Sequence, residues 1–161
     1  MVFSSHSCVK KLRVTEEEML TQVRKKTMEI SLLTDIGQKR SNNQDFVNKF
    51  VNKAGVTLVI VADGMGGHKA GDYASRYTVE TLEKLIREST LSEPAAIIES
   101  AVKQANTMLL EEANNHEEMK GMGTTLVICT IHDNVLTVAN VGDSRLYVVN
   151  QEIRQITKDH S

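Results

Sequence analysis

Two aspartates with a glycine beside them follow apolar stretches of the chain, and they are the residues best suited to chemistry. Asp63 comes after the nearly continuous apolar run 56–62, and Asp143 comes after the run 135–141. An aspartate at the end of a strand is held at the edge of the core, and Gly64, which lacks a Cβ, lets its carbonyl oxygen approach a ligand closely. Carboxylates gathered in one place repel each other unless a cation lies between them, and Mg²⁺ and Mn²⁺ bind such oxygen-rich sites. The pattern therefore predicts a divalent-cation site.

A polar loop over residues 38–44 adds further charged groups. Arg40 has a planar guanidinium that can bind two phosphate oxygens at once, and Asp45 supplies another carboxylate. Each feature alone has a simpler explanation, because Asp, Asn and Gly are common in turns and a loop arginine is usually solvated. The combination of these features is what favours a site for a metal and a phosphate group.

The glycine-rich stretch 64–71 offers an alternative, a nucleotide-binding loop. It contains four glycines, and a helix is expected to follow near Asp72. The stretch lacks the Gly-Lys-Ser/Thr ending of a phosphate-binding loop and the Gly-x-Gly-x-x-Gly spacing of a dinucleotide fold. Nucleotide binding is therefore the weaker hypothesis.

The surrounding pattern predicts strands, then two helices, then more strands. Short strands are expected over 30–33, 46–51 and 56–62. The predicted core face of the first helix contains Ala74, Thr78, Leu82, Leu85 and Ile86, and that of the second contains Ile98, Ala101, Val102, Ala105, Met108 and Leu109. An antiparallel meander is then expected over 124–131, 135–141, 146–149 and 152–156, with a turn at His132-Asp133-Asn134. This order predicts an α+β fold in which helices cover antiparallel sheet, rather than a doubly wound parallel fold.

Residues 1–28 differ from the rest and are expected to form an N-terminal extension. Thr15 and Glu18 have the spacing of a capping box and predict a short helix with acidic residues at its start and basic residues at its end. The helix is short and its apolar stripe is narrow, so an appendage is favoured over a docking helix for a partner.

Composition and charge exclude several classes of protein. The chain has 161 residues, 40% of them apolar and 25% charged, which suits a single domain with a core. A net charge of -2 with both signs interspersed argues against binding nucleic acid or an anionic membrane. No apolar run approaches the roughly 20 residues of a membrane-spanning helix. Two cysteines and no visible signal peptide favour a reducing, cytoplasmic location.

Several segments resemble, in order, the motifs of one known family. They are residues 34–37 with Arg40 and 43–45, then 61–68, 121–125, 140–145 and 157–161. Together they resemble the metal-dependent protein phosphatases of type 2C, the PPM family, over residues 29–161. Asp63-Gly64-Met65-Gly66-Gly67 is similar to the compact bacterial branch. Because the motifs occur in the family's order, the resemblance is more specific than any one of them.

The resemblance implies an α+β fold built as a layered αββα sandwich of antiparallel sheets flanked by helices. It implies hydrolysis of phosphoserine and phosphothreonine on proteins by a metal-activated water. Asp63 would bridge two metal ions, the Gly64 carbonyl would bind one of them, and Asp45 would hold the waters of that metal. Arg40 would bind the phosphate, and Asp143 would serve a third ion. The ions are expected to be Mn²⁺ or Mg²⁺, and the partners to be phosphorylated proteins and a cognate Ser/Thr kinase.

The resemblance also implies that the family's catalytic domain continues past the position of Ser161, with two further metal-binding aspartates. We therefore expect residues 29–161 to be the N-terminal portion of a phosphatase domain, with its C-terminal part missing. The competing hypothesis is a phosphatase-like module that binds a metal or a partner without hydrolysis.

Overall fold

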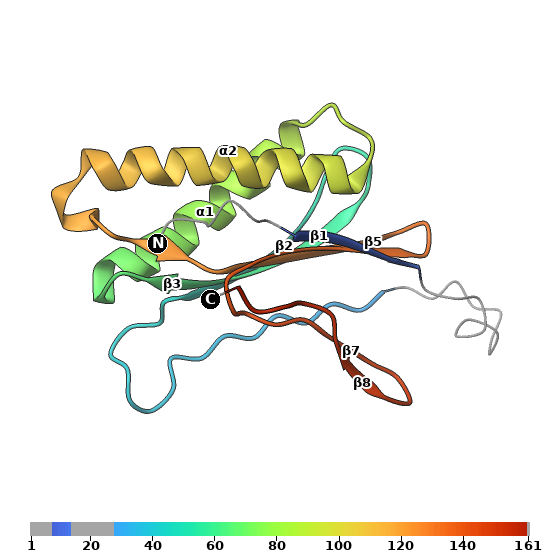
Figure 1. Cartoon of the computed structure of the whole chain (residues 1–161), viewed down its shortest axis with the longest axis horizontal. Coiled ribbons are helices and arrows are strands. Elements are labelled where there is room, and N and C mark those ends of the chain that lie inside the picture. The colour runs from blue at the N-terminus through green and yellow to red at the C-terminus, as the bar shows by residue number, and fades with distance from the viewer. Residues whose placement is uncertain (1–7, 14–27, 161) are drawn as a thin grey trace.

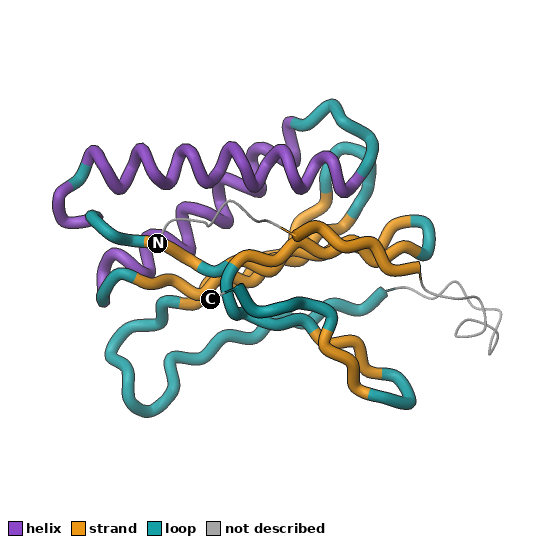
Figure 2. The backbone as a smooth tube through the Cα atoms, in the orientation of Figure 1, coloured by secondary structure: helices purple, strands orange, loops and turns teal. Residues whose placement is uncertain are grey.

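The protein is described by a computed structural model that covers residues 8–13 and 28–160. In Figure 1 two helices lie on one face of an antiparallel sheet, and a small hairpin and the loop 28–44 lie on the other face. Figure 2 shows the same division into a helical layer and a layer of strands. The α+β class is confirmed. The elements are β1 (Cys8–Arg13), β2 (Asp45–Val51), β3 (Thr57–Met65), α1 (His68–Glu88), α2 (Pro94–Asn115), the 3₁₀ turn η2 (Glu117–Met119), β4 (Gly123–Thr124), β5 (Leu126–His132), β6 (Val135–Val141), β7 (Tyr147–Val149) and β8 (Ile153–Gln155).

The larger sheet has the strand order β1-β6-β5-β3-β2, and the short β4 pairs with the end of β3. All of its pairings are antiparallel. The hairpin between β5 and β6 turns at Asp133 and Asn134, whose φ angles are 48° and 59°. Asp and Asn tolerate this left-handed conformation better than most residues, which is why the predicted turn forms here.

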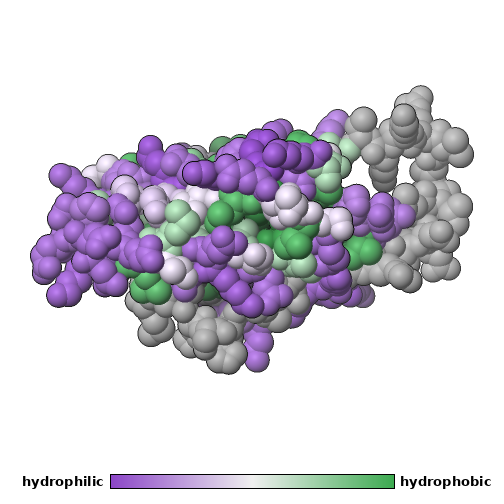
Figure 3. All heavy atoms as spheres, turned by 90° about the horizontal axis from the view of Figure 1, so that it is seen from above, coloured by the Kyte–Doolittle hydropathy of each residue, from purple (hydrophilic) through white to green (hydrophobic). Residues whose placement is uncertain are grey.

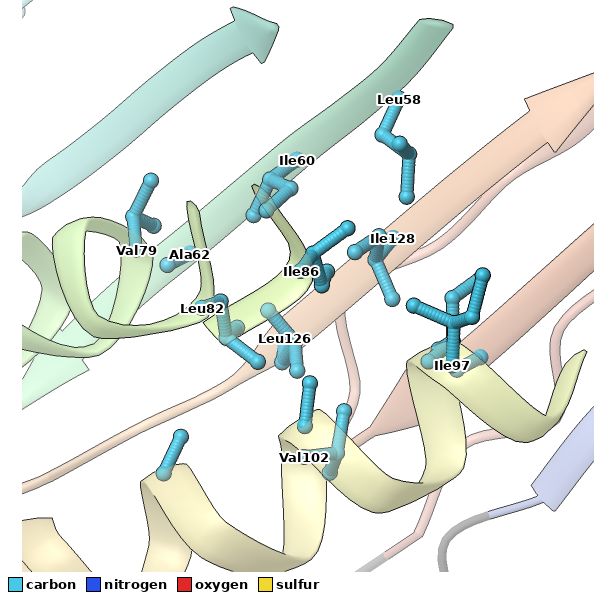
Figure 4. Close-up of a cluster of buried hydrophobic side chains, with 14 of the residues drawn as sticks. Leu58, Ile60, Ala62, Val79, Leu82, Ile86, Ile97, Val102, Leu126 and Ile128 are labelled. Carbon is cyan, nitrogen blue, oxygen red and sulfur yellow. The ribbon is translucent and has the colours of Figure 1, made fainter. Parts of the chain in front are cut away.

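Alternation along β3 decides which residues face the helices. Leu58, Ile60 and Ala62 are buried in the main core, where they pack against residues of both helices and of β5. Figure 4 shows Ile60 and Ala62 directed towards the same region as Leu82 and Ile86 of α1. Each such Leu or Ile contributes about 1.5 to 3 kcal/mol by leaving water. Because successive side chains of a strand point to opposite faces, residue 63 lies on the face away from the helices.

The opposite face of the sheet has its own smaller cluster. Val127, Leu136 and Val138 pack there with Ile156, which lies just after β8. Among the described strands, β7 and β8 pair only with each other, as a separate two-stranded sheet. The expected meander is therefore wrong at this point, because Gly142 (φ 90°) begins a turn that takes the chain away from β6.

Both predicted helices form, and α1 begins earlier than expected. The N-cap of α1 is Gly67, so the helix begins at His68 rather than near Asp72. α2 begins at Pro94, and the Glu93 side chain accepts a hydrogen bond from the backbone N–H of Ala96 at 2.8 Å.

Viewed from above the helices, the surface is mostly hydrophilic (Figure 3). Met108, predicted to lie on the core face of α2, is 38% exposed. None of the helices formed by the described residues is both long and apolar enough to cross a membrane.

The structure differs from the sequence-based expectation most clearly near the N-terminus. The strand expected over 30–33 is wrong: residues 28–44 contain neither helix nor strand, and Leu33 is 89% exposed. A strand needs a hydrogen-bonded neighbour, and none of the described strands pairs with this segment. Conversely, β1 pairs with β6 from Val135 to Asn140, although no strand was expected within residues 1–28. The short helix expected after Thr15 lies outside the described residues.

Candidate metal centre

Two of the predicted carboxylates lie face to face across a pair of strands. Asp45 at the start of β2 is the direct partner of Asp63 near the end of β3. The next pair along these strands, Gln44 and Gly64, is hydrogen-bonded, because the Gly64 N–H donates to the Gln44 carbonyl at 3.0 Å. Asp45 and Asp63 therefore occupy a non-hydrogen-bonded position, where opposite Cα atoms are about 4.5 Å apart and side chains approach most closely. The ladder itself brings these two carboxylates together.

The surroundings of Asp63 favour its neutral form when no cation is present. Burial raises the pKa of this carboxyl above 3.8, and the charge of Asp45 and a hydrogen bond with it raise the pKa further. The Arg40 guanidinium lowers the pKa, and Asp143 raises it by a smaller amount. All of the charged side chains predicted for the site therefore act on one half-buried carboxyl. A cation placed here would relieve the repulsion that raises the pKa.

Asp45, Arg40 and Asp143 are exposed, and each belongs to a different segment. Asp45 begins β2, Arg40 lies in the loop before it, and Asp143 follows β6 in the turn that begins at Gly142. Burial therefore distinguishes Asp63 from its neighbours. Asp63 is the residue that the core holds in place, and the others surround it from the solvent side.

Gly64 is a glycine because of packing. It is buried, and a Cβ added to it would overlap the backbone carbonyl of Gly71 in the first turns of α1. A Cβ added to Gly71 would in turn meet the Gln44 side chain and the Gly64 carbonyl. The close approach of these two glycines fixes the start of α1 against the end of β3, beside the carboxylate pair.

The glycine-rich stretch is also held from both sides. The Gln44 side-chain amide donates to the Gly67 carbonyl at 2.7 Å. Gly66 has a φ of 124°, and a Cβ there would lie 2.8 Å from the Cα of Met122. These backbone demands explain the glycines without a phosphate ligand. The structure thus offers no additional support for nucleotide binding by this stretch.

The donor set fits a hard cation that is partly coordinated by water. Within residues 8–13 and 28–160 there is no group of three or more His, Cys, Asp or Glu side chains arranged to hold a metal. The Asp45 and Asp63 pair supplies carboxylate oxygens, and the adjoining Gly64 carbonyl is a further oxygen donor. Mg²⁺ and Mn²⁺ accept such sites, because they are bound through one or two carboxylates and retain several waters.

Two hydroxyl residues at the site were not singled out from the sequence. Thr125, between β4 and β5, accepts a hydrogen bond through its Oγ1 from the Asp63 N–H at 3.1 Å, and its own N–H donates to the Asp63 carbonyl at 2.8 Å. The same Oγ1 lies 2.6 Å from the Ser144 Oγ. Both residues belong to segments that resemble motifs of the family, but nothing in their spacing along the chain indicates this contact.

Comparison with known proteins identifies the family. Residues 36–161 match the family model described as protein phosphatase 2C. The chain is 43% identical over 137 residues to protein phosphatase PhpP of Streptococcus pneumoniae, covering 83% of this chain and 56% of the relative. It is 40% identical over 139 residues to the serine/threonine phosphatase stp of Listeria welshimeri, covering 83% and 55%. The crystal structure of the S. agalactiae serine/threonine phosphatase superposes with a TM-score of 0.74 at 48% identity, covering 83% of this chain and 56% of that one.

This chain belongs to the protein phosphatase 2C family. The relatives named above carry the names of serine/threonine or protein phosphatases. The superposition of this chain, with its antiparallel sheets and two helices, on the S. agalactiae structure confirms the predicted α+β fold. The chain spans just over half the length of the curated relatives it matches.

Proposed function

We propose that this chain carries the metal- and phosphate-binding part of a protein serine/threonine phosphatase, which hydrolyses phosphoserine and phosphothreonine with the aid of Mn²⁺ or Mg²⁺. The observation that carries the proposal is the direct pairing of Asp45 with Asp63 across β2 and β3. Membership of the protein phosphatase 2C family and the names of the relatives support the type of reaction.

In this proposal Asp63 is the central metal ligand, because it is the half-buried carboxyl on which the other charges act. Asp45 faces it and completes the carboxylate pair, and the Gly64 carbonyl is the next oxygen along the strand. A divalent cation bound there supplies positive charge to stabilise the phosphate oxygens and lowers the pKa of water. Asp143, from the turn after β6, is the proposed ligand of a further ion, for two or three in total.

Arg40 is the proposed phosphate-binding residue. Its guanidinium is exposed, and its charge acts on Asp63 from the loop before β2. The loop is held by the Asn43 side-chain amide, which donates to the Thr34 hydroxyl at 2.8 Å. A guanidinium can hold two oxygens of a phosphate group and orient the phosphorus towards the carboxylate pair.

The proposed partners are phosphorylated proteins and a cognate Ser/Thr kinase whose products the enzyme reverses. The proposed location is the cytoplasm. Among the described residues the proposed site is open to solvent, since Arg40, Asp45 and Asp143 are all exposed. An open site of this kind suits a phosphorylated side chain on a protein surface.

The test is release of phosphate from a phosphothreonine peptide by the purified 161-residue chain during a manganese titration. Manganese-dependent release that is lost in Asp63→Asn and retained in Asp133→Asn, a substitution in the exposed turn between β5 and β6, would support the proposal. A folded chain that releases no phosphate at any manganese concentration would favour the alternative, a phosphatase-like module that binds a metal or a partner without hydrolysis.

A further inference from the structure

Thr125 connects the two segments that carry the proposed metal ligands. Its backbone N–H and its side-chain Oγ1 both bond to the backbone of Asp63, at 2.8 and 3.1 Å. Thr125 is 2% exposed, so water does not compete for these bonds. The end of β3 is therefore held at Asp63 through two separate atoms of one residue.

Ser144 extends this connection to the turn that carries Asp143. The Ser144 Oγ lies 2.6 Å from the Thr125 Oγ1, and Ser144 is the residue after Asp143. A hydroxyl has one proton to donate and two lone pairs to accept with. The Thr125 Oγ1 can therefore accept from the Asp63 N–H and still bond to Ser144, in either direction.

The backbone of the turn is shaped to allow this contact. A Cβ added to Gly142 would lie 2.8 Å from the Thr125 Cγ2, and the φ of Gly142 is 90°. The other side of the turn is held by the His160 N–H, which donates to the Gly142 carbonyl at 2.9 Å. Arg145 adds an ion pair to Asp159 with three hydrogen bonds, the shortest of them 2.6 Å. The turn is thus fixed from both sides, with Ser144 against Thr125.

We propose that Thr125 and Ser144 are positioning residues that hold the Asp63 and Asp143 segments at one relative placement through their paired hydroxyls. This inference rests on the proposed function, in which both aspartates bind ions. Neither hydroxyl needs to touch a metal. Residues that hold metal ligands in place alter metal affinity by about 10- to 100-fold when they are removed.

The experiment measures Mn²⁺ affinity by calorimetry on the full chain. We expect Thr125→Val and Ser144→Ala each to weaken Mn²⁺ binding at least about tenfold. Thr125→Ser keeps the hydroxyl and is expected to bind Mn²⁺ as the unchanged chain does. A role in packing alone would depend on the methyl group of Thr125. Unchanged Mn²⁺ affinity in Thr125→Ser would therefore assign the effect to the hydroxyl.

A matched control removes a similar buried hydroxyl elsewhere in the same strand. Thr130 is 3% exposed, and its Oγ1 donates to the Thr57 carbonyl at 2.7 Å at the far end of β5. Thr130→Val is expected to leave Mn²⁺ affinity close to that of the unchanged chain. The proposal is overturned if Thr125→Val and Ser144→Ala bind Mn²⁺ as tightly as the unchanged chain, or if Thr130→Val weakens binding as much as they do.

A second measurement separates this inference from the proposed function. If the unchanged chain binds no Mn²⁺, the proposed function fails, and hydrogen exchange of the Asp63 amide in the metal-free chain decides the inference. The Asp63 N–H donates to the Thr125 Oγ1, which also bonds to the Ser144 hydroxyl. Loss of that hydroxyl in Ser144→Ala is therefore expected to speed exchange at Asp63 more than Thr130→Val does. Equal exchange rates at Asp63 in these two variants overturn the proposal.

Discussion

Asp45 and Asp63 oppose each other at a position of the β2 and β3 ladder where neither backbone bonds to the other. At such positions the side chains of an antiparallel pair are closest, and like charges placed there are destabilising. The site therefore has a cost to folding that a bound cation removes.

We predict that Asp63→Asn stabilises the metal-free chain at neutral pH. The folded-state pKa of Asp63 is raised, first by burial and then by Asp45. A raised pKa means that the stability present below the ordinary value of 3.8 is lost as the pH rises through the folded-state pKa. Asparagine does not ionise and avoids this loss. Because Asp63 is only half-buried and solvent screens its charge, we expect a gain of about 0.5 kcal/mol.

Urea unfolding with a chelator present checks this at pH 3 and at pH 7.5. The variant should exceed the unchanged chain in unfolding free energy at pH 7.5, and the difference should shrink at pH 3. A variant that is less stable than the unchanged chain at pH 7.5 would contradict the proposed electrostatic origin of the shift.

Gly64→Ala should destabilise the fold strongly. The added methyl group would overlap the Gly71 carbonyl, which is backbone and cannot rotate away. We expect a loss of about 3 kcal/mol, at the upper end of typical overpacking costs. Gly71→Ala should cost less, since its added methyl group would meet the movable Gln44 side-chain amide first and the Gly64 carbonyl only at 2.9 Å. Equal unfolding midpoints for the two variants would contradict this ranking.

Tyr73 should ionise late in an alkaline titration. Burial raises its pKa to about 12, helped by the hydrogen bond from its hydroxyl to Glu112 at 2.8 Å. The neutral ring is favoured in the folded state, so the stability that this bond provides is complete below pH 10 and declines towards pH 12. Ultraviolet absorbance during an alkaline titration should show a late step that Tyr73→Phe removes. Persistence of that step in the variant would assign it to another residue.

Much of the fold could be predicted from local patterns. β3, β6 and the Asp133-Asn134 turn are found close to their expected positions, because a buried strand and a left-handed turn each leave a local signature. Residues 30–33 were misread since their apolar side chains fit a strand, yet no described strand pairs with them. β1 was missed for the opposite reason. Its polar sequence, with lysines at positions 10 and 11, gives no strand pattern, and its pairing with β6 is a long-range event.

The candidate site could likewise be predicted from local patterns only in part. The glycine beside Asp63 and the apolar run before it are local features, and they correctly place this residue near the end of a strand, which continues to Met65. The pairing of Asp63 with Asp45 depends on the register of two strands, which no spacing along the chain specifies. The contact of Thr125 with Ser144 leaves even less trace in the sequence, because side chains join the residue between β4 and β5 to the bend after β6.

The most direct test of the central claim, that the Asp45 and Asp63 pair forms a cation site, is calorimetric titration of the metal-free chain with Mn²⁺. The unchanged chain and the control Asp133→Asn are expected to bind Mn²⁺ alike. Asp63→Asn should weaken binding at least about 100-fold, since it removes a ligand rather than a supporting residue. Binding of Mn²⁺ by Asp63→Asn with the affinity of the unchanged chain would contradict the account.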